Sequence, residues 1–84
     1  MADVEITPDA LESYDRLPRT IQERVQKILI RLSNWPDVSG ARALSGELAG
    51  WHRIRTGDYR IRFFVKDEIV TVDKIGHRKD VYED

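Results

Sequence analysis

Arginine recurs at alternate positions in two neighbouring stretches of this 84-residue chain, as Arg53 and Arg55 and then as Arg60 and Arg62. Alternate residues of a strand point to one side, so each pair is expected to share a face, opposite Ile54 in the first stretch. Clustered like charges cost stability, and guanidinium groups suit bidentate contact with phosphate. The pattern predicts an anion-binding face. A solvated face whose arginines pair with nearby aspartates is the alternative.

A second group of chemically active residues lies at the C-terminal end of the sequence. It contains a histidine, two cations and a tyrosine: His77, Arg78, Lys79 and Tyr82. Histidine exchanges protons near neutral pH, and tyrosine can stack on a nucleobase. Beside the arginine strands these residues predict the other wall of one site. Taken alone, they also fit an ordinary solvated tail.

The composition excludes several kinds of chemistry. The chain has no cysteine, which removes thiolate metal sites, disulfides and cysteine nucleophiles. Its two histidines stand in no metal-binding pattern, and the sequence has no phosphate-binding glycine loop or serine-nucleophile motif. We therefore expect no metal and no cofactor. A phosphodiester would have to be cleaved without metal, which RNA permits because its 2′-hydroxyl can act as the nucleophile.

The charge balance and the apolar runs limit the classes of partner and the cellular compartment that we expect. The formal net charge is −1, so the chain is not a generally cationic nucleic-acid binder, and its basic character is confined to a local stripe. No apolar run approaches the length of a membrane span, and the acidic start at Met1-Ala2-Asp3 is unlike a signal peptide. We expect a cytoplasmic protein with no membrane partner.

The elements that must position these residues begin with a helical half. Residues 3–6 alternate between acidic and apolar side chains, as a short strand does. Thr7 and Pro8 suit the cap and first position of a helix that Pro18 then interrupts. A second helix is predicted from Arg19 to Asn34, since its apolar residues share one face: Ile21, Val25, Ile28, Leu29 and Leu32.

From Trp51 onward the period changes to two. The alternation predicts strands over residues 51–56, 59–65 and 69–75, with a tight turn at Gly57-Asp58. The expected fold is α+β, with an N-terminal strand, a two-helix antiparallel hairpin and a three-stranded antiparallel meander. The hairpin should cover one face of the sheet and leave the other open. Residues 1–84 are too few for a second core, so we expect a single domain.

Two segments resemble RelE-type toxins of bacterial and archaeal toxin–antitoxin modules. Residues 44–61 read Leu-Ser-Gly-Glu-Leu-Ala-Gly-Trp-His-Arg-Ile-Arg-Thr-Gly-Asp-Tyr-Arg-Ile, and residues 75–82 read Ile-Gly-His-Arg-Lys-Asp-Val-Tyr. With the helix hairpin, the resemblance covers nearly the whole chain and implies a RelE-like fold. These signatures are specific for the RelE/ParE superfamily rather than for one activity, because the related ParE-type gyrase poisons share the fold.

The resemblance implies a toxin that acts as a ribosome-dependent mRNA endoribonuclease. Such a toxin cuts messenger RNA in the decoding site through the 2′-hydroxyl and needs no metal. The implied partners are a cognate antitoxin protein, the ribosome and mRNA, with DNA reached only indirectly through the antitoxin.

The resemblance also implies roles for four catalytic residues. Arg60 matches the arginine thought to stabilise the transition-state phosphate, and Arg78 matches an arginine proposed as general acid. Tyr82 matches a tyrosine that stacks on the substrate base. His77 is the candidate general base, since related toxins use a C-terminal histidine.

The remaining cations are expected to bind substrate. Arg53 and Arg55 stand at strand positions where the best-known members have lysines. Arginine stays protonated and is a poor general base, so these two residues are expected to bind RNA together with Arg62 and Lys79.

Two other functions stay open from the sequence. One is a gyrase-directed toxin of the ParE type, which needs no acid–base set. The other is a catalytically weak protein whose main property is a tight antitoxin complex, for which the low net charge and the missing lysines are the motivation.

Overall fold

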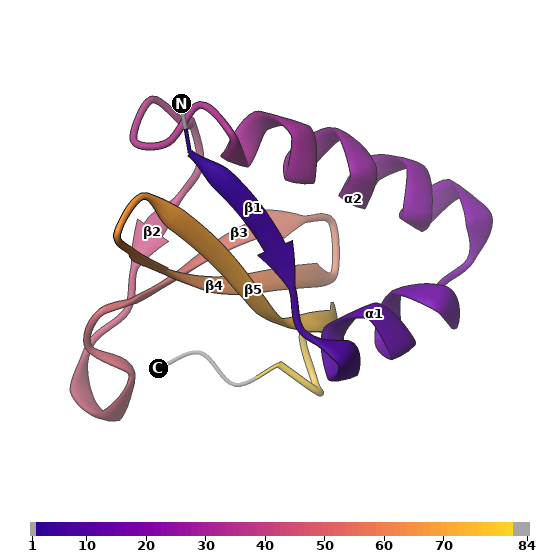
Figure 1. Cartoon of the computed structure of the whole chain (residues 1–84). Helices are drawn as coiled ribbons and strands as arrows, with labels where there is room; N and C mark the ends of the chain where they lie inside the picture. Colours follow the sequence, from indigo (N-terminus) through magenta and orange to yellow (C-terminus); the bar gives the residue numbers. More distant parts are fainter. Residues whose placement is uncertain (1, 82–84) are drawn as a thin grey trace.

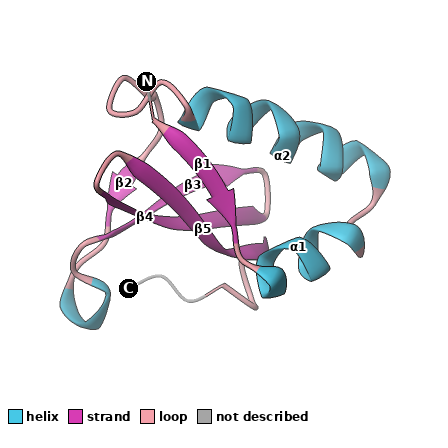
Figure 2. Ribbon diagram, viewed as in Figure 1, coloured by secondary structure: helices cyan, strands magenta, loops and turns pink. Residues whose placement is uncertain are grey.

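A computed structural model describes residues 2–81 (Figure 1). Its elements follow in the order β1 (Asp3–Ile6), α1 (Pro8–Asp15), α2 (Arg19–Leu32), β2 (Arg42–Ala43), a 3-10 helix (Gly46–Leu48), β3 (Trp51–Thr56), β4 (Tyr59–Lys66) and β5 (Ile69–His77). Figure 2 shows both α-helices together beside the sheet, with the short 3-10 helix on the opposite side of the molecule.

The two α-helices are held by local chemistry at their ends. The Thr7 hydroxyl accepts a hydrogen bond from the backbone N–H of Ala10 (3.2 Å), which caps α1, and Pro8 occupies a position where its missing N–H costs nothing. Pro18 then separates α1 from α2. Gln22 of α2 donates through Nε2 to the carbonyl oxygen of Tyr14 (3.0 Å), which ties the second helix to the end of the first.

The five strands form one mixed sheet in the order β1-β5-β4-β3-β2. Strands β3, β4 and β5 make the antiparallel meander that the alternation predicted. Strand β1 runs parallel to β5, with Asp3 opposite Ile69 and Ile6 opposite Val72. Strand β2 adds two residues to the other edge, antiparallel to β3.

The hydrophobic core fills the space between the helices and one face of the sheet. The buried side chains come from both layers: Ala10, Val25, Ile28, Leu32, Ile54, Ile61, Phe63, Val70, Val72 and Ile75. Because strand residues alternate in direction, their immediate neighbours on β3 and β4 project from the other, open face of the sheet.

The predicted architecture is confirmed, with corrections at its edges. Helix α2 ends at Leu32 rather than at Asn34, and β5 continues to His77 rather than ending at residue 75. Strand β2 and the 3-10 helix were not predicted. A two-residue strand is too short to show alternation, so only its pairing with β3 identifies it.

Candidate functional site

The four arginines of the strands share the open face of the sheet. Arg53 lies directly opposite Arg62, and Arg55 lies directly opposite Arg60. Residues paired in this way project to the same side, whereas Ile54, between the two positions, is buried in the core. The register therefore agrees with the predicted convergence, and we call these four residues the arginine face.

The members of the arginine face differ in exposure. Arg53 is 7 % exposed and Arg60 is 6 % exposed, while Arg55 is open to solvent. The Arg60 guanidinium donates through Nη1 to the carbonyl oxygens of Gly57 (3.0 Å) and Tyr59 (3.2 Å). These bonds hold the buried cation against the β3–β4 turn, as a buried charge requires.

Arg62 is paired with Asp73 of β5. Nε and Nη2 of Arg62 donate to the two carboxylate oxygens of Asp73 at 3.1 and 2.6 Å, and the side chains are only 12 % and 16 % exposed. A β-bulge produces this pair, because Arg62 lies opposite Lys74 while Phe63 lies opposite Val72. Asp73 is the extra residue. Aspartate pairing, the alternative raised by the sequence, is thus what the structure shows for Arg62.

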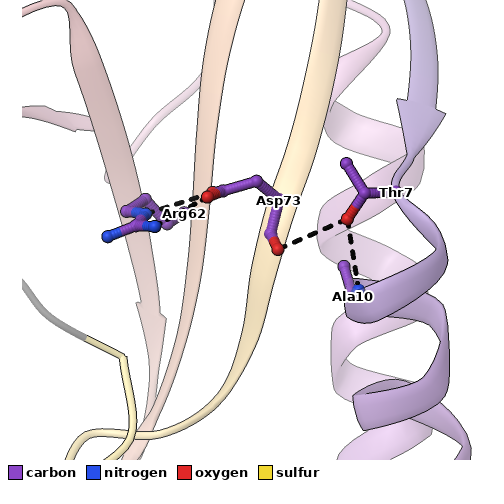
Figure 3. Close-up of polar contacts among 4 residues, drawn as sticks. All are labelled: Thr7, Ala10, Arg62 and Asp73. Carbon is purple, nitrogen blue, oxygen red and sulfur yellow. Dashed lines mark hydrogen bonds and ion pairs between the residues drawn. The ribbon is translucent and has the colours of Figure 1, made fainter.

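Asp73 also connects the arginine face to the start of α1. The Thr7 hydroxyl donates to the backbone oxygen of Asp73 (3.4 Å) while it accepts from the N–H of Ala10 (Figure 3). One residue therefore holds Arg62 with its side chain and the cap of α1 with its backbone.

Two aromatic residues flank Arg62 on the open face. Trp51 and Phe64 lie opposite each other on β3 and β4, with ring centroids 4.7 Å apart in an edge-to-face arrangement. The Arg62 guanidinium carbon lies 5.0 Å from the centre of the Trp51 ring, within the range of a cation–π contact. Trp51 was not among the predicted site residues, although its strand position, two before Arg53, was the signal that placed it on this face.

The segment after β5 turns back sharply. The backbone N–H groups of Asp80 and Val81 both donate to the carbonyl oxygen of His77, at 2.7 and 3.2 Å. Val81 is buried, and its Cγ2 would lie 3.4 Å from a Cβ added at Gly76. In Figure 1 this yellow segment bends away from the end of β5 and back under the sheet. A Cβ at this position would be in van der Waals contact with Val81, so the close return restricts residue 76 to a small side chain.

This turn brings Arg78 to the β3–β4 turn. The backbone N–H of Arg78 donates to the carbonyl oxygen of Asp58 (2.7 Å), next to the Gly57 oxygen that the Arg60 side chain contacts. The Arg60 side chain and the Arg78 backbone thus both bond to the β3–β4 turn, at one end of the sheet. The side chains of Arg78 and Lys79 are exposed.

His77 lies on the other side of the sheet. It pairs with Tyr59 across the strands, with ring centroids 5.6 Å apart, and shares the helix-facing side with Ile75. Its Nδ1 accepts a hydrogen bond from the backbone N–H of Lys79 (3.2 Å). The structure does not bring His77 together with Arg60, because β5 extends through residue 77 and strand alternation turns the ring toward the helices. Tyr82 lies outside the described residues.

The second histidine, His52, lies on the face of the sheet that packs against the core. Its ring stacks on Phe63 (5.5 Å between centroids) and meets the edge of Trp35 (4.8 Å). Within residues 2–81 its buried Nδ1 has no hydrogen-bond partner, and burial lowers the pKa of His52 below its ordinary value of 6.5. We therefore assign it to packing, as a neutral imidazole.

Two absences hold for the described part of the chain. In residues 2–81 no three histidine, cysteine, aspartate or glutamate side chains gather as metal ligands would. Within the same residues no helix has the length and apolar character needed to cross a membrane. The arginine face itself offers fixed cations, which can bind a phosphate and stabilise added negative charge on it.

Comparison with known proteins assigns the family. A family model described as ParE toxin of type II toxin-antitoxin system, parDE, matches residues 4–82. The chain belongs to the ParE toxin family. No curated protein matches the sequence of this ParE-family chain.

Solved structures of related toxins share the fold of the ParE-family chain. A chain of the RelBE2 toxin–antitoxin complex from Mycobacterium tuberculosis is 29 % identical, with a TM-score of 0.80 over 92 % of this chain and 98 % of that one. The isolated E. coli RelE toxin is 21 % identical, with a TM-score of 0.76 over 92 % and 84 %. The YoeB/ParE toxin from Agrobacterium tumefaciens is 17 % identical, with a TM-score of 0.76 over 89 % and 96 %.

These findings confirm the family predicted from residues 44–61 and 75–82. The ParE-family chain is a type II toxin of the RelE/ParE superfamily, with the RelE-like α+β fold.

Proposed function

We propose that this toxin is a ribosome-dependent mRNA endoribonuclease that cleaves through the RNA 2′-hydroxyl without a metal ion. The observation that carries the proposal is that the Arg60 side chain, from β4, and the Arg78 backbone, from the segment after β5, both bond to the β3–β4 turn. Exposed Arg55 lies directly opposite Arg60. These three arginines belong to chain segments at the same end of the sheet, and arginine suits contact with a phosphate.

The chemistry follows from these positions. The 2′-oxygen attacks the adjacent phosphorus, the bond from phosphorus to the 5′-oxygen breaks, and the products are a 2′,3′-cyclic phosphate and a 5′-hydroxyl. Arg60, held in place before substrate arrives, stabilises the negative charge that grows on the phosphate oxygens. Arg78 is the proposed donor of the proton that the leaving 5′-oxygen takes up. The place of His77 on the helix-facing side favours water as the acceptor of the 2′-hydroxyl proton.

The other predicted residues take supporting roles in this proposal. Arg55 and Lys79 are exposed and would contact flanking phosphates. Arg53 and Arg62 are held within the arginine face. We therefore propose that they support the structure of the site and add to its positive electrostatic potential. Stacking of Tyr82 on a base remains part of the proposal.

The proposed setting is that of a cytoplasmic module with a cognate antitoxin. Related chains occur in structures described as toxin–antitoxin complexes, from M. tuberculosis and E. coli. We propose that the antitoxin, the ribosome and mRNA are the partners of a single toxin domain over residues 1–84, and that DNA is met only through the antitoxin.

A second candidate is a gyrase-directed toxin, favoured by the parDE description of the family model. A third is a catalytically weak, antitoxin-binding toxin, favoured by the burial of Arg53 and Arg60. Neither requires the Arg60–Arg78 arrangement for chemistry.

Primer extension on a reporter mRNA, in cells that express the toxin alone, tests the proposal. Wild type should cut at discrete in-frame codon positions, and only during translation. Arg78→Ala should reduce cutting at least 100-fold, and Arg60→Met should do the same with its fold checked by circular dichroism. Lys66→Ala, an exposed cation at the other end of β4, is the matched control and should cut normally. Intact mRNA with DNA breaks would establish the gyrase function instead, and intact mRNA with normal growth the antitoxin-binding one.

A further inference from the structure

A cleft of about 400 Å³ opens at the end of the sheet that carries Arg60 and Arg78, but on the helix-facing side. Tyr59 and His77 form one part of its wall, Ile75 and Leu17 give it an aliphatic surface, and Ser13 adds a hydroxyl. Nothing in the proposed cleavage chemistry uses this space. Its size lies within the range of small-molecule sites.

The hydrogen bonding of His77 fixes what the ring offers to the cleft. Because Nδ1 accepts the backbone N–H of Lys79, Nδ1 carries no proton, and the neutral ring bears its proton on Nε2. His77 therefore presents a hydrogen-bond donor at Nε2. An imidazole whose unprotonated nitrogen, Nδ1, already accepts a hydrogen bond is badly placed to act as a general base.

The charges around the cleft argue against an anionic occupant. Asp80 stands on its wall, and Arg16, the cation of the lining, is paired with Glu12 of α1. The remaining surface combines two aromatic rings, aliphatic carbon and neutral polar groups. A planar neutral group with hydrogen-bond acceptors fits this mixture, as a nucleobase does when it leaves its stack.

The position of the cleft relates it to the proposed phosphate site. Tyr59 and His77 directly precede Arg60 and Arg78 in the sequence, and the carbonyl oxygen of Tyr59 accepts from the Arg60 guanidinium. A nucleotide with its phosphate at Arg60 therefore has the cleft beside it, around the end of the sheet.

We propose that the cleft beside His77 is a subsite for one nucleobase of single-stranded RNA, held by the Tyr59 and His77 rings and a hydrogen bond from His77 Nε2. This rests on the proposed RNA-cleaving function and deepens it: the cleft sets which base flanks the cut. His77 then acts as a specificity residue and takes no part in proton transfer.

A binding experiment tests the subsite without relying on catalysis. The full-length toxin, labelled at its methyl groups, is titrated with the four nucleoside 5′-monophosphates and, separately, with ribose 5-phosphate. The methyl signals of Leu17 and Ile75 should move with at least one nucleotide and stay in place with the sugar phosphate. His77→Asn keeps an acceptor for the Lys79 N–H but loses the Nε2 donor, so it should weaken binding at least fivefold. His77→Gln, which keeps a donor near Nε2, should bind more tightly than His77→Asn.

Cleavage by translating ribosomes separates failure of the subsite from failure of the function. If the subsite is correct, His77→Asn loses base preference beside the cut, because its cleavage falls more at the preferred base than at the other bases. Cleavage by wild type without any methyl shift overturns the subsite and leaves the endoribonuclease standing. Equal loss of cleavage in both His77 variants, with nucleotide binding unchanged, would make His77 a general base and would also overturn the subsite. Methyl shifts with the antitoxin but not with nucleotides assign the cleft to that protein. Nucleotide binding without cleavage retains the subsite and refutes the ribonuclease.

Discussion

The pair between Arg62 and Asp73 should contribute more to stability than any exposed ion pair of this toxin. Asp73→Ala leaves the Arg62 guanidinium largely buried with its bidentate partner removed. Breaking a fully buried pair costs about 3–5 kcal/mol, and since water reaches both side chains slightly, we expect the lower end, about 3 kcal/mol. The total free energy of unfolding of a domain of this size is roughly 4–13 kcal/mol. A loss of about 3 kcal/mol should lower the melting temperature by roughly 12–24 °C.

A double-mutant cycle isolates the pair from the other contacts of Arg62. Arg62→Ala, Asp73→Ala and the double variant are unfolded in urea, with tryptophan fluorescence as the signal. We expect a coupling free energy of about 2 kcal/mol. The matched control is Arg16–Glu12, an i, i+4 pair at the C-terminal end of α1 whose side chains are 75 % and 63 % exposed, for which a few tenths of a kcal/mol is typical. A coupling for Arg62–Asp73 no larger than that of the control would refute the reasoning.

Three further predictions concern the fold around the site. Because burial lowers the pKa of His52, the unfolded chain takes up a proton first, near pH 6.5, so the free energy of unfolding should fall as the pH drops from about 6.5 toward the lower pKa of the folded state. His52→Phe should lessen that loss in urea melts at pH 7.5, 6.5 and 5.5. An equal dependence of the unfolding free energy on pH in wild type and variant would contradict the assignment. Thr7→Ala should cost about 1 kcal/mol through loss of the α1 cap, whereas Thr7→Ser should be nearly neutral in the same melts. Gly76→Ala, whose added carbon meets Val81 at 3.4 Å, should change the free energy of unfolding by less than about 0.5 kcal/mol. Gly76→Val should cost about 1–3 kcal/mol and shift the Val81 methyl signals. An equal effect of both substitutions would argue against this contact.

Local periodicity predicted most of the fold and the common face of the arginines. Alternation over residues 51–56 and 59–65 depends only on backbone geometry, so it placed Arg53 and Arg55 correctly before any tertiary contact was known. The Thr7-Pro8 start of α1 is equally local. These features are set by neighbours in the sequence, and that is why a single sequence predicts them.

The features that the sequence did not predict depend on distant pairings. Arg53 and Arg60 are buried in the folded chain, and no local sequence pattern marks their burial. The bulge that turns Asp73 toward Arg62 exists only relative to the partner strand. His77 looked like part of the polar tail, but β5 continues through it and alternation turns its ring away from Arg60.

The parallel pairing of β1 with β5 has a consequence for synthesis. Residues 3–6 are synthesised well before their strand partner, residues 69–72. Contacts so distant in sequence form slowly, because a long loop must close first. Until β5 has been made, the nascent chain therefore lacks the strand on which β1 docks, and the arginine face has no finished sheet beneath it. The topology thus delays completion of the arginine face until β5 has been synthesised, so this surface forms late relative to the helices.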